Sequence, residues 1–192
     1  MNENQNRESI EKSLTKSIFK VSTMAAAAAV LGVIALIVIA GRYSYALKNF
    51  GFAQGDIGKA MFEFADLRSS LRAAIGYDDA DAIDTVVRQH DEGKVLFAQY
   101  FAEIEKTIVS EAGRETYDAI SAELDAYWKL DGEIMDMGAT TDRELCKQAQ
   151  ELALNDLAPM YNSIYSKLDE LLEVKVNEGN DLSRTLLILS AI

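Results

Sequence analysis

The stretch "KNFGFAQGDIGKAMFEFADLRSSLRAAIGY", residues 48–77, carries the pattern that decides the fold. Apolar residues recur in it at three- and four-residue steps, namely Ile57, Met61, Phe64, Leu67, Leu71 and Ile75. Residues at that spacing share one face of an α-helix, so the pattern predicts a helix that buries a single stripe. Gly51, Gly55 and Gly58 each weaken a helix by about 1 kcal/mol relative to alanine, which predicts a looser beginning. The sequence Gly76-Tyr77-Asp78-Asp79 then indicates a helix stop followed by a new N-cap.

Upstream lies "VSTMAAAAAVLGVIALIVIAG", Val21–Gly41, which contains no charged residue. As a helix it is about 31 Å long, close to the hydrocarbon thickness of a bilayer, so it is predicted to span a membrane. A core helix is excluded, because an amphipathic chain of 192 residues cannot enclose a helix that is apolar all round. A cleaved signal peptide is the remaining alternative, with Val38-Ile39-Ala40 as its cleavage site, although signal peptides usually have shorter apolar regions.

The flanking charges predict the orientation of this helix. Four basic residues precede it, Arg7, Lys12, Lys16 and Lys20, whereas Arg42 and Lys48 follow over a similar length. The positive-inside rule therefore places residues 1–20 in the cytoplasm and the chain after Arg42 outside, with the helix in the cytoplasmic (inner) membrane. Tyr43 and Tyr45 would then lie at the outer interface, where aromatic residues are enriched.

Composition limits what the exported part can be. From Arg42 to Arg184 there are 28 acidic and 15 basic residues, a net charge of −13, which makes nucleic acid and anionic membrane surfaces poor partners. A single proline and abundant Ala, Leu, Glu and Asp predict helix nearly throughout. Cys146 is the only cysteine, so no intrachain disulfide can form, and it is expected to act as a small apolar residue.

Three further helices are predicted from the breaks in the chain. The second covers about residues 79–108 and buries Ile83, Val86 or Val87, His90, Leu96 or Phe97, Tyr100, Phe101, Ile104 and Ile108. The third begins with Ser110 as a cap, ends at Gly138, and buries Tyr117, Ile120, Leu124, Tyr127, Leu130, Ile134 and Met137.

The fourth helix is predicted to open with a capping box in which Thr141 and Glu144 satisfy each other's backbone donors. It should bend where Pro159 removes a hydrogen bond. Its predicted apolar stripe consists of Leu145, Leu152, Leu157, Tyr161, Ile164, Leu168, Leu171 and Leu172.

Short connections between long helices force neighbours to be antiparallel, so the predicted fold class is all-α. We expect a transmembrane helix followed by an antiparallel up-down-up-down four-helix bundle over residues 42–184. The last stretch, "TLLILSAI" at residues 185–192, is apolar but too short to cross a bilayer. It is predicted to begin a second, truncated transmembrane helix.

Four local patterns carry a family resemblance: "LRSSLRAAI", then "YDDADAID", then "AYWKLDGEIMDMG", then "LAPMYNSIYSKLDELLEVKVNEG". Together with the layout they resemble the four-helix-bundle ligand-binding module of bacterial methyl-accepting chemotaxis proteins, over Val21–Ile192. The resemblance implies a homodimeric receptor that detects a small molecule or a periplasmic binding protein. It also implies that a helix displacement carries the signal across the membrane to cytoplasmic output domains.

The resemblance further implies that arginines on the first bundle helix hold an acidic or amino-acid ligand at the dimer interface. Arg68 and Arg72 are the candidates here, because they lie four residues apart and have no acidic residue three or four positions away. The alternative is that a carboxylate from a neighbouring helix or subunit neutralises them.

Other residues favour a structural role. His90 is the only histidine, and the Glu-x-x-His pairs of a di-iron bundle do not occur. The acidic run "DDADAID" lacks a glycine-centred calcium loop, and Trp128 is expected to pack in the core or a groove. No catalytic triad, Cys/His pair or phosphate loop is present, so we expect no enzymatic activity, no metal and no cofactor.

Three alternatives to the chemotaxis receptor remain open. The same kind of bundle could regulate a membrane histidine kinase or a diguanylate cyclase, or it could be a membrane-tethered helical protein that binds a partner without signalling.

Overall fold

The computed structural model describes residues 3–190, and it describes side chains from residue 11 to residue 187. Its contacts divide the chain into two units, one ending at Tyr45 and the other beginning at Ala46. All regular elements within the described residues are helical, with no β-strand among them, so the predicted all-α class is confirmed.

Helix α1 (Glu3–Ala46) forms the first unit up to Tyr45, and its side chains from residue 11 to residue 45 are exposed. Within the described residues, one helical stretch, Glu11–Gly76, is long and apolar enough to cross a membrane, with a mean hydropathy of 2.6 over its most apolar window. This finding rests on length and composition, and the predicted span at Val21–Gly41 lies inside the stretch.

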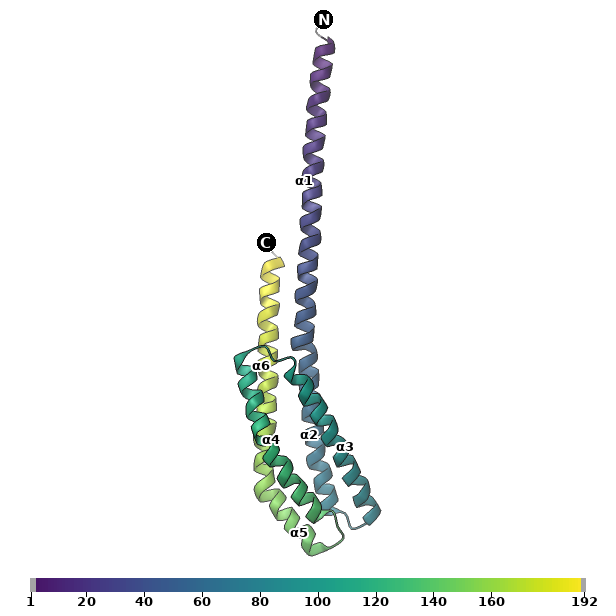
Figure 1. The fold of residues 1–192 in the computed structure, drawn as a ribbon, viewed down its shortest axis with the longest axis vertical. Coiled ribbons are helices and arrows are strands. Elements are labelled where there is room, and N and C mark those ends of the chain that lie inside the picture. Colours follow the sequence, from purple (N-terminus) through teal and green to yellow (C-terminus); the bar gives the residue numbers. More distant parts are fainter. Residues whose placement is uncertain (1–2, 191–192) are drawn as a thin grey trace. The chain divides into compact units, whose positions relative to one another are not determined.

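The second unit is a four-helix bundle. Its elements in chain order are η1 (Leu47–Gly51), α2 (Phe52–Gly76), α3 (Ala80–Glu105), α4 (Glu111–Gly138), α5 (Arg143–Leu152), η2 (Ala153–Leu157) and α6 (Ala158–Ser190). Helices α2, α3 and α4 run side by side with alternating direction, and the α5–η2–α6 segment forms the fourth rod (Figure 1). The predicted up-down-up-down bundle is therefore confirmed.

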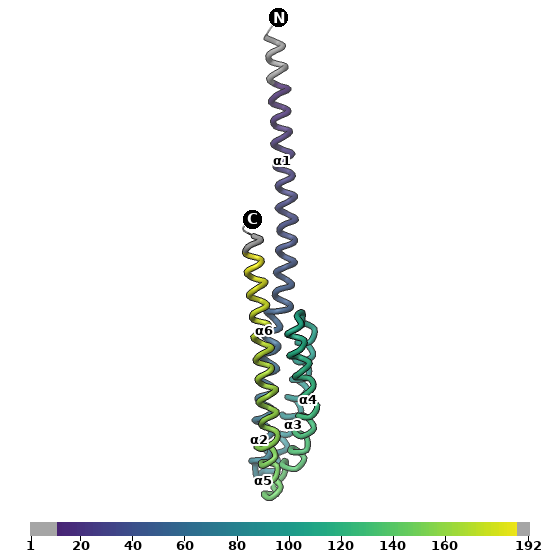
Figure 2. The backbone as a smooth tube through the Cα atoms, turned by 90° about the vertical axis from the view of Figure 1, so that its left-hand side faces the viewer, coloured from purple at the N-terminus to yellow at the C-terminus, as the bar shows by residue number. Residues whose placement is uncertain are grey.

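The two ends of the bundle differ in their connections. Residues 77–79 and 139–142 turn the chain at one end, where α5 also lies, and we call this the α5 end (Figure 1). Residues 106–110 join α3 to α4 at the opposite end. Helix α6 continues well past that connection, as both views show (Figure 2).

The core follows the predicted stripes. The largest fully buried apolar side chains include Ile57, Phe64, Phe97, Ile120, Tyr127, Ile164 and Leu168. Val86 and Phe97 are the buried members of the two pairs that the sequence left open, since Leu96 is 38 % exposed and Val87 is only partly buried. Phe64 stands at the centre, with its ring stacked on Tyr161 at a centroid distance of 4.9 Å.

Two of the three predicted helix beginnings are confirmed. The Asp79 carboxylate accepts a hydrogen bond of 2.8 Å from the Ala82 backbone N–H, and Ser110 Oγ accepts one of 3.1 Å from Gly113. The third prediction is wrong, because Asp142 replaces Thr141 as the cap of α5 and accepts from the N–H groups of Glu144 and Leu145. A carboxylate suits this position because it satisfies two free donors and carries the negative charge that a helix N-terminus favours.

The fourth rod departs from the prediction in two further details. Leu145 is 40 % exposed, while Cys146 beside it is buried and takes the inward position as a small apolar residue. The predicted irregularity at Pro159 is a π-helical turn, η2, which ends two residues before the proline. Proline has no N–H to bond to the carbonyl four residues earlier, and a wider turn accommodates that missing bond.

The end of the chain is described only in part. Helix α6 extends to Ser190, so residues 185–190 are helical, while Ala191 and Ile192 lie outside the described residues. The start of a second transmembrane helix at residues 185–192 stays a prediction.

Candidate functional site

The α5 end is built around a close approach of three helices. A Cβ atom on Gly138, at the end of α4, would lie 2.7 Å from Ile75 Cγ1 and 2.8 Å from Ala149 Cβ. Only glycine permits this contact between α4, α2 and α5, because real Cβ atoms keep longer distances. The basic residues of α5 are thereby brought next to those at the end of α2.

Arg68 and Arg72, the two predicted site residues, lie one turn apart on α2. The guanidinium of Arg68 lies 4.4 Å from the ring centroid of Tyr161 on α6, a cation–π geometry that holds it against the bundle. Arg72 is exposed, so its guanidinium remains open to solvent. Both line a small notch of about 10 Å³, which we call the arginine notch, together with Leu71, Tyr127, Ala153, Leu157, Ala158 and Tyr161.

A larger hollow of about 390 Å³ adjoins the arginine notch and shares Arg72 and Ala153 with it. We call it the cationic hollow; its other lining residues are Ile75, Gly76, Arg143, Cys146, Lys147, Gln150 and Leu154. The α5 residues Arg143 and Lys147 line it together with Arg72 of α2. Three cations therefore line one hollow, and a fourth lies in the notch beside it.

No carboxylate is among the lining residues of either recess. Arg143 does reach outward to Asp78, at 3.2 Å between Nη2 and Oδ2, but both side chains of this pair are exposed. Within the described part of the chain, Arg68, Arg72 and Lys147 take part in no ion pair. An exposed ion pair contributes little, so the recesses keep a positive character that suits an anion.

Two tyrosines form the inner wall of the arginine notch. Burial raises the pKa of the Tyr161 hydroxyl, and the nearby Arg68 opposes part of that rise. Burial also raises the pKa of Tyr127, with a further contribution from Asp131. Both phenols are therefore neutral near neutral pH and leave the positive charge of the arginines uncompensated.

Sequence reasoning identified Arg68 and Arg72 but not Arg143 or Lys147. The pattern available was a basic pair four residues apart at the start of a helix, the same spacing that singled out the α2 arginines. The spacing did not show that this pair lies beside the α2 arginines, because only the turn at residues 139–142 brings α5 against the end of α2.

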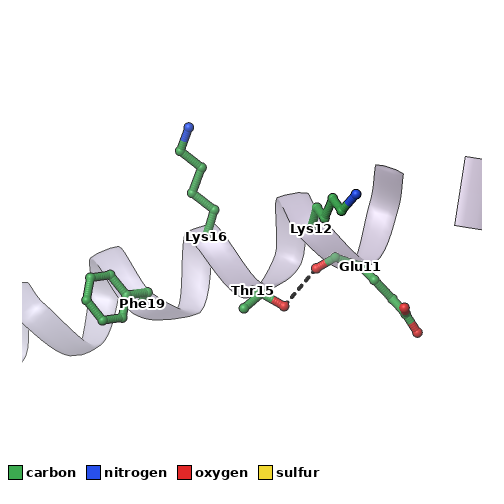
Figure 3. A pocket seen from close by; sticks show the side chains of 5 residues that line it. All are labelled: Glu11, Lys12, Thr15, Lys16 and Phe19. Carbon is green, nitrogen blue, oxygen red and sulfur yellow. Dashed lines mark hydrogen bonds between the residues drawn. The ribbon is translucent and has the colours of Figure 1, made fainter. Parts of the chain in front are cut away.

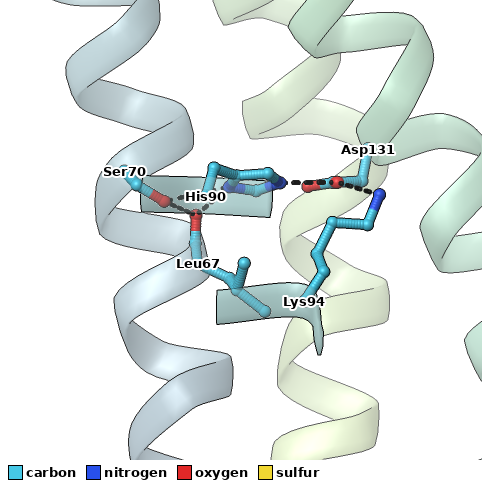
Figure 4. Close-up of polar contacts among 5 residues, drawn as sticks. All are labelled: Leu67, Ser70, His90, Lys94 and Asp131. Carbon is cyan, nitrogen blue, oxygen red and sulfur yellow. Dashed lines mark hydrogen bonds and ion pairs between the residues drawn. The ribbon is translucent and has the colours of Figure 1, made fainter. Parts of the chain in front are cut away.

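A buried polar cluster lies in the middle of the bundle and joins three helices (Figure 4). His90 of α3 is 2 % exposed, and its Nε2 lies 2.9 Å from Oδ2 of Asp131 on α4. On its other side, Nδ1 lies 2.9 Å from Oγ of Ser70 on α2, and that hydroxyl donates to the Leu67 carbonyl at 2.9 Å. We call these residues the His90 cluster.

The contact with Asp131 requires a hydrogen on Nε2 of the histidine ring. Because a carboxylate only accepts, Nε2 must carry a hydrogen and donate it to Asp131. Lys94 Nζ approaches the same Asp131 oxygen to 3.6 Å (Figure 4). The same ammonium lies 5.3 Å from the ring centroid of Trp128. The cluster is thus mostly satisfied from within, which agrees with the structural role expected for His90.

Neither metal-ligating side chains nor the hollow along α1 provide a further binding site among the described residues. Among the described residues, no group of three or more His, Cys, Asp or Glu side chains could hold a metal ion. A hollow of about 560 Å³ lies along α1, but its lining residues Glu11, Lys12, Thr15, Lys16 and Phe19 all belong to one helix (Figure 3). Side chains on a single exposed helix cannot enclose a ligand.

Comparison with known families agrees with the architecture. A family model described as a four helix bundle sensory module for signal transduction matches residues 54–185, from the first turn of α2 almost to the end of α6. The comparisons with curated proteins and with solved structures returned no match. The matched region covers well over half of the chain and contains α3, α4, α5 and most of α2 and α6, with both recesses at the α5 end. The chain therefore belongs to the four-helix-bundle sensory modules of methyl-accepting chemotaxis proteins, which serve signal transduction and are not themselves catalytic.

Proposed function

We propose that this sensory module recognises an anionic group at its α5 end, with Arg68 and Arg72 as the principal contacts. The observation that carries the proposal is the charge of the two recesses there. Four cations and no carboxylate line them, although acidic residues outnumber basic ones by 28 to 15 in residues 42–184. In so acidic a domain, a recess without a carboxylate favours an anion from outside the chain.

In this proposal the cations at the α5 end have different roles. Arg68, held against Tyr161, offers a fixed guanidinium, while the exposed Arg72, Arg143 and Lys147 can adjust to the bound group. A guanidinium matches a carboxylate or phosphate with two parallel hydrogen bonds, so arginine at the fixed position gives direction as well as charge. The ligand would be a small molecule or a periplasmic binding protein that presents such an anion.

We further propose that the protein is a homodimer and that its interface lies on the exposed face of α2. Small or apolar residues follow one another there at three- and four-residue steps: Gly55, Gly58, Phe62, Ala65 and Ser69. Phe62 is 68 % exposed, which is unusual for a phenylalanine in the middle of a helix and favours a covering partner. Arg72 continues the same face, so a second copy would bring two Arg72 side chains together, and a shared anion would relieve their repulsion.

We also propose a membrane topology. Residues 1–20 lie in the cytoplasm, Val21–Gly41 cross the cytoplasmic membrane, residues 42–184 lie outside, and residues 185–192 enter a second span. The long exposed apolar face of α1 and the excess of basic residues before it support this orientation. A ligand that favours one packing of the bundle would then shift α2 or α6, and this displacement would transmit the signal.

Thermal unfolding of the full chain in lipid nanodiscs tests the anion site, with the fluorescence of Trp128, the only tryptophan, as the reporter. Succinate, citrate and inorganic phosphate serve as probes, and neutral acetamide is the control. We expect at least one anion to raise the unfolding midpoint, because a ligand that binds only the folded state stabilises it. The double variant Arg68→Ala/Arg72→Ala should lose this increase.

The matched control is Arg88→Ala, which removes an exposed arginine of α3 that lines neither recess. Arg88→Ala should keep the full increase. An equal increase in the wild type and in the Arg68→Ala/Arg72→Ala variant, or no increase with any of the three anions, would overturn the proposed site.

Cross-linking tests the dimer interface separately. Phe62→Cys in a Cys146→Ser chain should form a disulfide-linked dimer on mild oxidation, whereas Lys129→Cys, on the exposed side of α4, should not. Equal cross-linking at the two positions would contradict the α2 interface.

A further inference from the structure

A groove in the bundle lies between α3 and α4 and shares no lining residue with the arginine notch or the cationic hollow. These two helices are joined directly by residues 106–110, yet within the described residues α3 packs its backbone against α2, and α4 packs mainly against α6. Side chains therefore fill the space between α3 and α4 incompletely. The groove that remains measures about 440 Å³.

Aromatic rings form the walls of this groove. Phe101 stacks on Tyr117 at a centroid distance of 4.3 Å and an interplanar angle of 12°, which links the two helices across the groove. Phe97 stacks on Phe101 at 5.6 Å and meets the edge of Trp128 at 5.5 Å. The exposed Ala98 and Ala102 also line it, and their short side chains leave its outer side open.

The polar groups of the groove balance one another in charge. Its lining contains one cation, Lys94, and one anion, Asp125. The ammonium of Lys94 is already engaged, since it lies 3.6 Å from the buried Asp131 carboxylate (Figure 4). It also lies 5.3 Å from the Trp128 ring centroid. Counted together, the Lys94 and Asp125 side chains give the lining no net charge, in contrast to the cationic hollow.

We propose that this groove binds a small planar aromatic molecule that carries no net charge. An aromatic ring inserted over Ala98 and Ala102 would stack against rings that are themselves held by the core, so binding has to order few side chains. A hydrogen-bonding substituent on such a molecule would meet Lys94 or Asp125 at the rim. A charged substituent of either sign would find one of the two groups repulsive and would lose part of its hydration on entering the groove.

The site is distinct from the anion site of the proposed function, and neither proposal depends on the other. The bundle would then have two inputs of different chemistry, one at the α5 end and one between α3 and α4. Occupation of the groove would press on Phe97 and Trp128, both of which contact Phe64 in the core.

Binding of benzamide to the full chain in nanodiscs tests the proposal, with quenching or shift of the Trp128 emission as the signal. Benzoate and benzylammonium keep the ring and add one charge of either sign. We expect saturable binding of benzamide and dissociation constants about tenfold higher for both ions, equivalent to about 1.4 kcal/mol each. Both ions are measured on the Arg68→Ala/Arg72→Ala variant, in which the anion site at the α5 end is removed. Saturable binding of an ion to that variant as tight as that of benzamide would overturn the neutral ligand class.

Variants locate the site. Ala98→Leu places a branched side chain in the groove from an exposed helical position, so the fold should persist while the dissociation constant for benzamide rises about tenfold. Ala126→Leu makes the same change at an exposed position of α4 outside the groove and should leave the constant unchanged; it also controls for partition of benzamide into lipid. Equal binding by Ala98→Leu and the wild type, or loss of binding in Arg68→Ala/Arg72→Ala, would overturn the assignment to this groove.

Discussion

The His90 cluster and the α5 end both have cations beside them, but the surroundings of these cations are opposite. In the middle of the bundle, Lys94 approaches Asp131, which also accepts from the buried His90. At the α5 end, Arg68, Arg72 and Lys147 line recesses without any carboxylate. The difference teaches that the surroundings, and not the residue type, decide whether a charge holds the fold together or is available to a ligand.

Burial explains the difference. Asp131 is 1 % exposed, and a charge so deeply buried must find its partner within the chain, because leaving it unpaired costs several kcal/mol. A cation at the surface stays hydrated, so it bears no such cost and remains available to an anion from outside. We therefore expect substitutions in the His90 cluster to change stability, and substitutions at the α5 end to change ligand binding.

The largest expected effect is that of Asp131→Ala. It would remove the buried carboxylate, leave His90 Nε2 without its acceptor, and destabilise the bundle by about 3 kcal/mol. Thermal unfolding followed by Trp128 fluorescence measures this loss. Asp136→Ala, at an exposed position of the same helix, should change stability by less than about 0.5 kcal/mol. Equal stability of the two variants would remove the His90 cluster from the determinants of the fold.

Gly138→Ala should come next, with a loss of about 2 kcal/mol, because its Cβ would collide with Ile75 and Ala149 and push α5 away from α2. Gly132→Ala on the same helix meets no atom within 4 Å and should instead stabilise by about 1 kcal/mol. Gly138→Ala should also weaken anion binding at the α5 end, because it moves α5. Unchanged anion binding would show that the cationic hollow does not depend on the close approach of α4 to α2 and α5.

Tyr127 lines the arginine notch at the α5 end and also packs on Trp128, which lies beside Lys94 of α3. Its hydroxyl has no hydrogen-bond partner among the described residues. Burial raises its pKa in the folded state above the value of about 10 in the unfolded chain. The unfolded state therefore loses this proton first, and stability falls as pH rises above about 10.

Tyr127→Phe removes that contribution, so the fall in stability between pH 8 and pH 11 should be smaller by about 1 kcal/mol than in the wild type. Denaturant titrations at the two pH values measure it. Lys175, whose pKa is lowered by burial, titrates in both proteins and cancels in the comparison. The exposed Tyr77→Phe should leave the dependence on pH unaltered, and an identical fall in Tyr127→Phe and wild type would contradict the buried state of this phenol.

The smallest effect on stability should come from Arg68→Ala/Arg72→Ala, with a decrease below about 0.5 kcal/mol for each of the two arginines. The guanidinium of Arg72 is exposed, and the interaction that Arg68 makes with Tyr161 is a single cation–π pair. Unfolding without added anion measures this value directly. A large decrease would show that the arginines serve the fold, as the residues of the His90 cluster do, and would weaken their assignment as ligand contacts.

Much of the fold could be predicted because the spacing of apolar residues along the chain indicates where helices lie. The stripe from Ile57 to Ile75 is buried as expected, apart from the partly buried Met61. The caps at Asp79 and Ser110 follow from side chains that lie beside the donors they satisfy. The errors occurred where two neighbouring residues could play the same part. Thr141 and Asp142 can both cap, and Leu145 and Cys146 can both face inward, so the choice depends on how the turn at residues 139–142 sets the phase of α5.

The candidate site was predictable only in part. Arg68 and Arg72 stand out in the sequence because no acidic residue lies three or four positions away on their own helix, but their assignment as ligand contacts stays a prediction. Arg143 and Lys147 could not be connected to them, since more than sixty residues of chain intervene. The partnership of His90 with Asp131 was likewise out of reach, because residues on different helices have no fixed spacing in the sequence.

The sequence by itself determined the helices, their amphipathic stripes, their order and a bundle with an apolar segment before it, since these follow from local propensity and periodicity. Tertiary structure alone decided which charges on different helices meet. The rotation of each helix about its axis and the turn before α5 leave Lys94 beside a carboxylate, and leave Arg68, Arg72 and Lys147 in recesses without one. Such pairings are set by packing between distant segments, and periodicity within one helix carries no information about the phase of its neighbour.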